Sequence, residues 1–216
     1  MENPFLIGEK IYLRPVEPED AKFLSKGEND PIVREALFLA LPISLSNEQE
    51  KIEQLIKSKE AIVLIIVEKE TDKPVGQTAF FRIDYISRAA VFYIAILDPA
   101  CWSKGLGSEA TQLMVDCAFK TLNLNRIQLH VCAENTAAIK IYQRVGFQQE
   151  GVLRQAMFRN GNYVDFWVMG ILRSDWLITT SFEKELLNDI HSAVKEVQNG
   201  KFITNEEAKL RLQITD

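Results

Sequence analysis

A loop with two glycines at residues 102–108 constrains the fold of this chain more than any other feature. It reads W-S-K-G-L-G-S-E-A from Trp102 to Ala110 and lies between an apolar run, broken at Asp98-Pro99, and a helical pattern. Glycines at such a junction let backbone N–H groups approach an anion, and the following helix start adds positive potential. Lys104 adds charge. We therefore expect an anionic ligand, such as a pyrophosphate, although a ligand-free tight turn would use the same glycines.

The elements around the loop follow from periodicity and from helix start and stop signals. Proline with neighbouring acids starts a helix at Pro18, Ser46 opens a capping box, and Asn160-Gly161 is typical of a type I′ hairpin. We predict strands over 10–14, 61–68, 75–84, 89–97, 126–132, 147–158 and 163–172, and helices from 18, over 46–58, over 105–121 and over 135–145.

The order of these elements predicts a mixed α+β fold. Antiparallel strands come first and a β-α-β crossover follows, so we expect a mostly antiparallel central sheet flanked by helices. The 216 residues, 47% hydrophobic, suffice for one domain and an appendage. We place the domain at residues 1–176. Residues 177–216 carry their own apolar helical face and a second capping box at 204–207, which predicts a helical C-terminal extension.

Composition argues against several classes of protein. The net charge of -5 lacks the clustered basic excess of a nucleic-acid-binding protein. The longest apolar run, Ala61 to Val67, is too short to span a membrane, and the N-terminus lacks a signal pattern. Cys101, Cys117 and Cys132 match no zinc or redox spacing, and two histidines argue against a metal site. We expect a cytoplasmic protein without a metal.

A dinucleotide-binding fold is the first alternative for the loop. Gly105, Gly107 and Ala110 fit G-x-G-x-x-A, and Glu134 lies near the end of the next strand. A dinucleotide fold usually opens with this loop, whereas here it follows several strands that look antiparallel. Too few β-α units follow to complete a doubly wound sheet, so we disfavour this reading.

Four ordered motifs resemble the GNAT acetyltransferase superfamily. Trp102-Ser-Lys-Gly105-Leu-Gly107 resembles Gln/Arg-x-x-Gly-x-Gly/Ala, with Trp in the first position as is common in the RimJ/RimL-like branch. Residues 135–147 resemble Asn-x-x-Ala-x-x-x-Tyr-x-x-x-Gly-Phe. The stretch L-R-P-V-E-P-E-D at 13–20 and the closing hairpin, with E-G-V-L-R at 150–154 and Asp165, are also similar. The resemblance covers roughly residues 8 to 176.

This resemblance implies acetyl-CoA as cosubstrate. It implies a splayed strand pair, at 95–97 and 126–132, whose free backbone groups hold the pantetheine arm and polarise the thioester carbonyl. The pyrophosphate is expected on 103–108, and Ala138 keeps the next helix thin where CoA passes. The residues expected to bind the cofactor are Ala95, Ile96, Leu97, Trp102, Ser103, Lys104, Gly105, Leu106, Gly107, Ser108, Asn135 and Ala138.

Tyr142 is the catalytic residue that the resemblance implies. A phenol with a pKa of about 10 is protonated at neutral pH and can protonate a departing thiolate. It follows Asn135 by two helical turns, on one helix face. The general base stays open between Glu134, Asp84, Asp165 and a water relay. His130 and Cys101 are interpreted as structural.

The acceptor is left open as a polyamine, a small amine or a protein N-terminal amine. Residues 83–96 are similar to bacterial spermidine/spermine acetyltransferases, but those enzymes usually carry a glutamate where this chain has Val91. The alternative function is a CoA-binding domain that acts as an interaction or sensor protein through 177–216. That extension is expected to pack on the domain, to join a second copy in a homodimer, or to bind a protein partner.

Overall fold

The computed structural model describes residues 3–37 and 39–180. Its strands are β1 (Leu6–Ile7), β2 (Ile11–Pro15), β3 (Ile62–Glu68), β4 (Lys73–Asp84), β5 (Ala89–Ile96), β6 (Arg126–Cys132), β7 (Gln148–Arg159) and β8 (Asn162–Leu172). Its α-helices are α1 (Ala21–Asn29), α2 (Pro31–Leu37), α3 (Leu45–Lys57), α4 (Leu106–Lys120) and α5 (Thr136–Val145), and η1 (Pro18–Asp20) and η2 (Pro99–Cys101) are short 3-10 turns.

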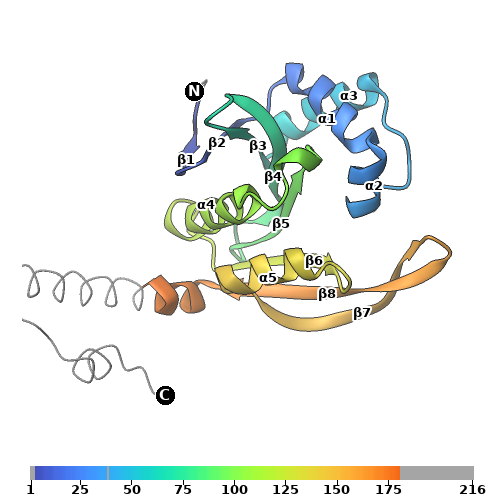
Figure 1. The fold of residues 1–216 in the computed structure, drawn as a ribbon. Coiled ribbons are helices and arrows are strands. Elements are labelled where there is room, and N and C mark those ends of the chain that lie inside the picture. The colour runs from blue at the N-terminus through green and yellow to red at the C-terminus, as the bar shows by residue number, and fades with distance from the viewer. Residues whose placement is uncertain (1–2, 38, 181–216) are drawn as a thin grey trace, which may run out of the picture. The chain divides into compact units, whose positions relative to one another are not determined.

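The strands form one sheet in the order β1-β2-β3-β4-β5-β6-β8-β7 (Figure 1). Neighbouring strands pair antiparallel except β5 and β6, which are parallel. The parallel pair arises because α4 carries the chain from the end of β5 back to the start of β6. The mixed α+β fold with a mostly antiparallel sheet, expected from the sequence, is confirmed.

Helices pack on the sheet through apolar side chains at helical spacing. Leu24 of α1 and Ile52 of α3 are buried in one cluster with Ile65 of β3. Figure 1 shows α1, α2 and α3 grouped together, away from α4 and α5. Helix α4 buries Ala110 and Met114 and contacts β2, β4 and β5. This packing fixes the start of α4, and with it the glycine loop, against the middle of the sheet.

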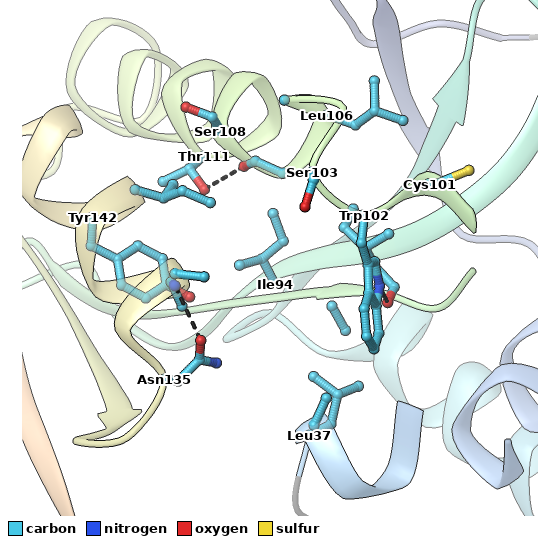
Figure 2. Close-up of a pocket in the computed structure, with 18 residues that line it drawn as sticks. Leu37, Ile94, Cys101, Trp102, Ser103, Leu106, Ser108, Thr111, Asn135 and Tyr142 are labelled. Carbon is cyan, nitrogen blue, oxygen red and sulfur yellow. Dashed lines mark hydrogen bonds between the residues drawn. The ribbon is translucent and has the colours of Figure 1, made fainter. Parts of the chain in front are cut away.

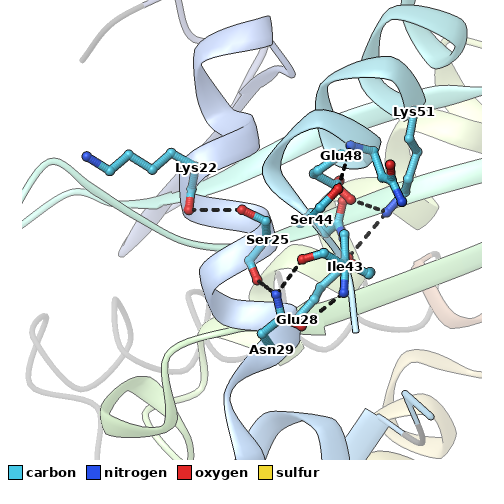
Figure 3. Close-up of polar contacts among 10 residues, drawn as sticks. Lys22, Ser25, Glu28, Asn29, Ile43, Ser44, Glu48 and Lys51 are labelled. Atoms are coloured by element: carbon cyan, nitrogen blue, oxygen red, sulfur yellow. Dashed lines mark hydrogen bonds and ion pairs between the residues drawn. The ribbon is translucent and has the colours of Figure 1, made fainter. Parts of the chain in front are cut away.

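A buried polar cluster joins α1 and α3 to β4 (Figure 3). Glu28 Oε1 accepts a hydrogen bond from Gln77 Nε2 at 2.8 Å, and Lys51 Nζ lies 3.4 Å from the same oxygen. Lys51 Nζ also lies 3.1 Å from Glu48 Oε2, and the Glu48 side chain is fully buried. Burial, followed by the charge of Glu28, raises the pKa of Glu48. The cluster thus holds two carboxyl groups against one ammonium.

The predicted strand boundaries agree with the structure within two residues. Asn160 and Gly161 both have positive φ, +46° and +85°, as a type I′ hairpin requires. The prediction that Ser46 caps α3 is wrong, because Ser44 Oγ accepts the hydrogen bond from Asn47 N at 3.1 Å. Ser46 lies inside the first turn.

Three short elements were not predicted: β1, α2 and the 3-10 turn η2. Strand β1 has two residues, which is too short for a period-2 signal. Helix α2 begins at Pro31, and Asp30 Oδ1 accepts hydrogen bonds from Ile32 N and Val33 N. Pro31, like Pro18, is a proline at the first helical position, so the sequence did carry a start signal.

The chain divides into two compact units, Met1–Arg173 and Ser174–Asp216. Residues 174–180 of the second unit are helical. The rest of the predicted extension at 177–216 lies outside the described residues, so the boundary at residue 176 and the helical extension stay predictions. None of the described helices combines the length and apolar character needed to cross a bilayer.

Candidate functional site

The glycine loop leads from η2 into the first turn of α4. Gly105 is the N-cap residue of α4 and has a φ of +86°, a conformation that glycine adopts without steric cost. The first i→i−4 hydrogen bond of the helix is donated by Glu109 N to Gly105 O at 3.0 Å. The N–H groups of residues 106–108 therefore have no partner within the helix and are available to an anion.

A cavity of about 410 Å³, called the loop cavity below, lies against this loop (Figure 2). Its walls come from α2, β5, the glycine loop, α4 and α5. The residues predicted from the sequence that line it are Ala95, Ile96, Trp102, Ser103, Gly105, Leu106, Gly107, Ser108, Asn135, Ala138 and Tyr142. The structure therefore brings the glycine motif and the Asn135–Tyr142 motif to one site, although a whole strand separates them in sequence.

Strands β5 and β6 part beside this cavity. Their paired residues are Ala89 with Arg126, Ala90 with Ile127, and Val91 with Gln128. Beyond Val91, β5 continues beside β4, and β6 continues beside β8. The predicted splay is thus present, but it begins after Gln128 and not at Arg126, because residues 126–128 are the ones that pair.

The residues of β5 whose backbone amides are free at the splay are not all the ones predicted. Leu97 N is engaged on the other side, donating to Val75 O at 2.8 Å, so Leu97 offers no free amide and does not line the cavity. Antiparallel alternation then directs Ala95 toward β4 and the amides of Ile94 and Ile96 toward the splay. The Ile96 carbonyl accepts a hydrogen bond from the indole Nε1 of Trp102 at 3.0 Å.

Lys104 is the second predicted residue that does not line the loop cavity. Its Nζ lies 3.8 Å from Glu68 Oε1, and both residues line a second cavity. The Lys104 side chain is 51% exposed, so this ion pair is screened by solvent and is weak. The charge that the sequence suggested for an anion at this position therefore lies outside the loop cavity.

Tyr142 projects from α5 into the cavity (Figure 2). Its ring makes edge contacts with Phe92 of β5, at a centroid distance of 6.5 Å, and with Phe147, at 5.9 Å. Burial raises the pKa of Tyr142 to about 12. The phenol is therefore protonated throughout the physiological range, and its apolar surroundings make the anionic form costly.

Asn135 is the N-cap residue of α5. Its Oδ1 accepts a hydrogen bond from Ala138 N at 3.1 Å, which fixes the start of the helix. Gly146 closes the helix in a left-handed conformation with φ of +109°. Both ends of α5 are therefore anchored, so the position of Tyr142 between them is well defined.

The three carboxylates considered as general bases lie outside the loop cavity. Glu134 Oε2 is 3.5 Å from Arg159 Nη1, and Asp165 Oδ1 accepts from Gln155 N at 2.8 Å. Asp84 sits in an exposed turn, where hydrogen bonds from the Ser87 side chain and from backbone amides lower its pKa. None of the three is positioned as a base toward this cavity.

Several lining residues were missed by sequence reasoning: Ala36, Leu37, Ile94, Cys101, Thr111, Ala137 and Ile141. The signal for Ile94 was its period-2 spacing from Ile96, and Ile141 directly precedes Tyr142. Thr111 lies one turn after Gly107 and donates its hydroxyl to Gly107 O at 2.7 Å. Leu37 had no signal, because α2 was not predicted. Within the described residues, no group of three or more His, Cys, Asp or Glu side chains could hold a metal ion.

Comparisons with known proteins identify the family of this chain. Residues 10–148 match the family model of the acetyltransferase (GNAT) domain. The uncharacterised N-acetyltransferase p20 of Bacillus licheniformis is 34% identical over 175 residues, covering 79% of this chain and 97% of that protein. Spermidine N(1)-acetyltransferase of Vibrio cholerae is 31% identical over 171 residues, covering 79% of this chain and 98% of that protein.

Solved structures give the same result. The crystal structure of spermidine N-acetyltransferase from Vibrio cholerae in complex with CoA and spermine matches with a TM-score of 0.73 and 29% identity. The match covers 79% of this chain and 99% of that one. The chain therefore belongs to the GNAT acetyltransferase family and is an acetyl-CoA-dependent N-acetyltransferase.

Proposed function

We propose that this enzyme transfers the acetyl group of acetyl-CoA directly to a primary amine of a polyamine, with Tyr142 as general acid. One observation carries the proposal: the half-buried Tyr142 side chain and the glycine loop line the same cavity. The choice of a polyamine is supported by the relatives named spermidine N(1)-acetyltransferase, which align over nearly their whole length. The relatives described above are all named as acetyltransferases, which gives the sensor alternative no support.

The cofactor would lie along the loop cavity. Its pyrophosphate accepts hydrogen bonds from the N–H groups of 105–108, and its pantetheine arm runs along the open edge of β5. The amide of Ile94 or of Ile96 is the donor available to the thioester oxygen, which gains negative charge as the amine attacks. Trp102 supports this edge through its bond to the Ile96 carbonyl, and Asn135 and Ala138 form the opposite wall.

The chemistry then requires protons to leave the amine nitrogen, to reach the sulfur and to return to Tyr142. The amine reaches the thioester carbonyl as a neutral nucleophile, having lost its extra proton to water. Its nitrogen bonds to the carbonyl carbon, the carbon–sulfur bond breaks, and the sulfur leaves as a thiolate. Tyr142 donates its phenolic proton to that sulfur and regains one from solvent. The nitrogen releases its second proton, so the products are the N-acetylamine and free CoA.

An amine panel tests the acceptor. Release of free CoA thiol is measured with acetyl-CoA and spermidine, spermine, a simple monoamine, or short peptides with free N-termini. We expect turnover with the polyamines; turnover with peptides alone would contradict a polyamine acceptor. Val91, which stands where the polyamine enzymes usually carry a glutamate, lies at the last β5–β6 pair. Val91→Glu is expected to alter the KM for the amine more than the KM for acetyl-CoA.

We further infer a place in the RimJ/RimL-like branch, on the basis of Trp102, and a cytoplasmic location. The three cysteines are free and buried thiols, as is usual in a reducing compartment. A homodimer, or a protein partner bound by residues 177–216, is inferred for the extension. Deletion of 177–216 with unchanged elution volume and unchanged activity would contradict the homodimer.

A further inference from the structure

The ammonium group of Lys10 contacts the backbone of the glycine loop, although Lys10 and Lys104 are 94 positions apart in the sequence. Lys10 Nζ donates a hydrogen bond to the backbone carbonyl of Lys104 at 3.3 Å. The same nitrogen is 3.8 Å from the point that a Cβ would occupy on Gly105. The loop backbone at the start of α4 is therefore in contact with a cation from the turn between β1 and β2.

The turn that carries Lys10 is itself fastened to α4. The Glu109 carboxylate, in the first turn of α4, accepts hydrogen bonds from the backbone N–H of Glu9 and from that of Lys10, at 3.1 and 3.2 Å for the latter. Gly8 makes room for this contact, because a Cβ there would lie 2.1 Å from Glu109 Oε1. The β1–β2 turn and the glycine loop thus form one hydrogen-bonded unit, called the Lys10 clamp below.

The clamp affects the direction of the loop N–H groups. The Lys104 carbonyl and the Gly105 N–H belong to one planar trans peptide, so they point in opposite directions. A hydrogen bond that draws the carbonyl toward Lys10, away from the loop cavity, directs the Gly105 N–H toward that cavity. The Lys104 side chain does not line the loop cavity, and its ammonium lies 3.8 Å from Glu68 Oε1.

We propose that Lys10 is a positioning residue for acetyl-CoA: its ammonium orients the peptide between Lys104 and Gly105 so that the loop N–H groups face the cofactor pyrophosphate. This rests on the proposed binding of the pyrophosphate at 105–108. Lys10 acts on cofactor affinity and not on the acceptor or on the chemical step.

Three variants test the proposal: Lys10→Met removes the donor and the charge, Lys10→Arg keeps both, and Lys22→Met removes one charge from an exposed position on α1. We expect Lys10→Met to weaken CoA binding, measured by calorimetry, roughly tenfold, as for loss of one charge-assisted hydrogen bond. The KM for acetyl-CoA should rise similarly, with kcat and the acceptor KM unchanged. Lys10→Arg should restore binding, and Lys22→Met should match the wild type.

A second measurement separates orientation from simple charge. If Glu109 acts by holding Lys10, Glu109→Ala also weakens CoA binding, and the double variant with Lys10→Met binds no worse than the weaker single variant. Full additivity would contradict the clamp. Wild-type affinity of Lys10→Met, or an effect on kcat alone, would overturn the role of Lys10. Absence of CoA binding by the wild-type protein would instead reject the proposed function.

Discussion

Removing the hydroxyl of Tyr142 tests the proposed chemistry most directly. Tyr142→Phe deletes one oxygen and leaves the ring, with its edge contacts to Phe92 and Phe147, in place. Stability should change little, because these apolar contacts remain. A positioned general acid typically contributes about 10² to 10⁴ in rate. We expect kcat to fall by at least ~100-fold, while the KM for acetyl-CoA stays within about twofold.

The pH dependence of kcat is an independent test of the Tyr142 hydroxyl. Burial raises the pKa of Tyr142 from 10.0 to about 12. At pH 8 the phenolate fraction is therefore about one in ten thousand, since the pH lies four units below the pKa. Because the folded-state pKa is the higher one, the protonated form stabilises the fold below about pH 10, and that contribution is lost as the pH rises toward 12. Tyr142 should cause no decline in kcat below pH 10.

The assay is thiol release at saturating acetyl-CoA and spermidine, from pH 7 to pH 10. Tyr85→Phe is the control, since Tyr85 is 60% exposed in the β4–β5 turn. Circular dichroism confirms that each variant folds. A folded Tyr142→Phe enzyme whose kcat is within about threefold of the wild type would refute the acid role. A kcat that declines between pH 8 and pH 10 in the wild type, but not in the variant, would contradict the raised pKa.

Three further predictions concern the frame of the site. Gly76→Ala should destabilise the protein by about 1–3 kcal/mol in urea denaturation, because its Cβ would lie 2.2 Å from a backbone carbonyl of β5, whereas Gly151→Ala meets no atom within 4 Å and should be near neutral. Glu48→Gln should raise the free energy of unfolding at pH 8 but not near pH 4. The raised pKa of Glu48 means that its ionised form, present at pH 8, destabilises the fold, whereas near pH 4 the carboxyl group is protonated. Equal increases in the free energy of unfolding at both pH values would contradict this. Trp102→Phe removes the indole donor to the Ile96 carbonyl and should cost about 1 kcal/mol with a higher KM for acetyl-CoA; an unchanged KM and stability would show that this bond is unimportant.

Local signals predicted most of the fold. The strands alternate or are continuously apolar, and Gly146 and the Asn160-Gly161 turn have the positive φ that their residue types favour. The errors occurred where local signals were ambiguous or brief. Ser44 and Ser46 both carry a hydroxyl able to cap α3, and only the chain direction before the helix decides between them.

The sequence predicted which motifs form the site, but not which way their backbone N–H groups and side chains point. The glycine loop was identified by its two glycines between a strand and a helix, and Tyr142 by the resemblance of residues 135–147 to the GNAT motif. Whether a backbone amide on β5 is free depends on strand pairing, so local patterns did not reveal that the Leu97 amide is engaged by Val75 or that Ile94 lines the cavity. The contact between Lys10 and the loop joins distant segments, and no periodicity within either segment encodes it.

The short pairing between β5 and β6 also has a mechanical consequence. In the part of the chain that the structure describes, the sheet strands β1–β5 are joined to β6–β8 through residues 89–91 and 126–128. The two halves of the sheet are therefore connected by one short stretch of pairing, called the seam below. A cofactor bound where β5 and β6 separate would contact both halves and restrict their relative motion. Ligand that binds only the folded state stabilises it by about 2.7 kcal/mol at a hundredfold excess over Kd. Much of that gain should appear as slower amide hydrogen exchange along the seam, so substrate supply would set how rigid the enzyme is.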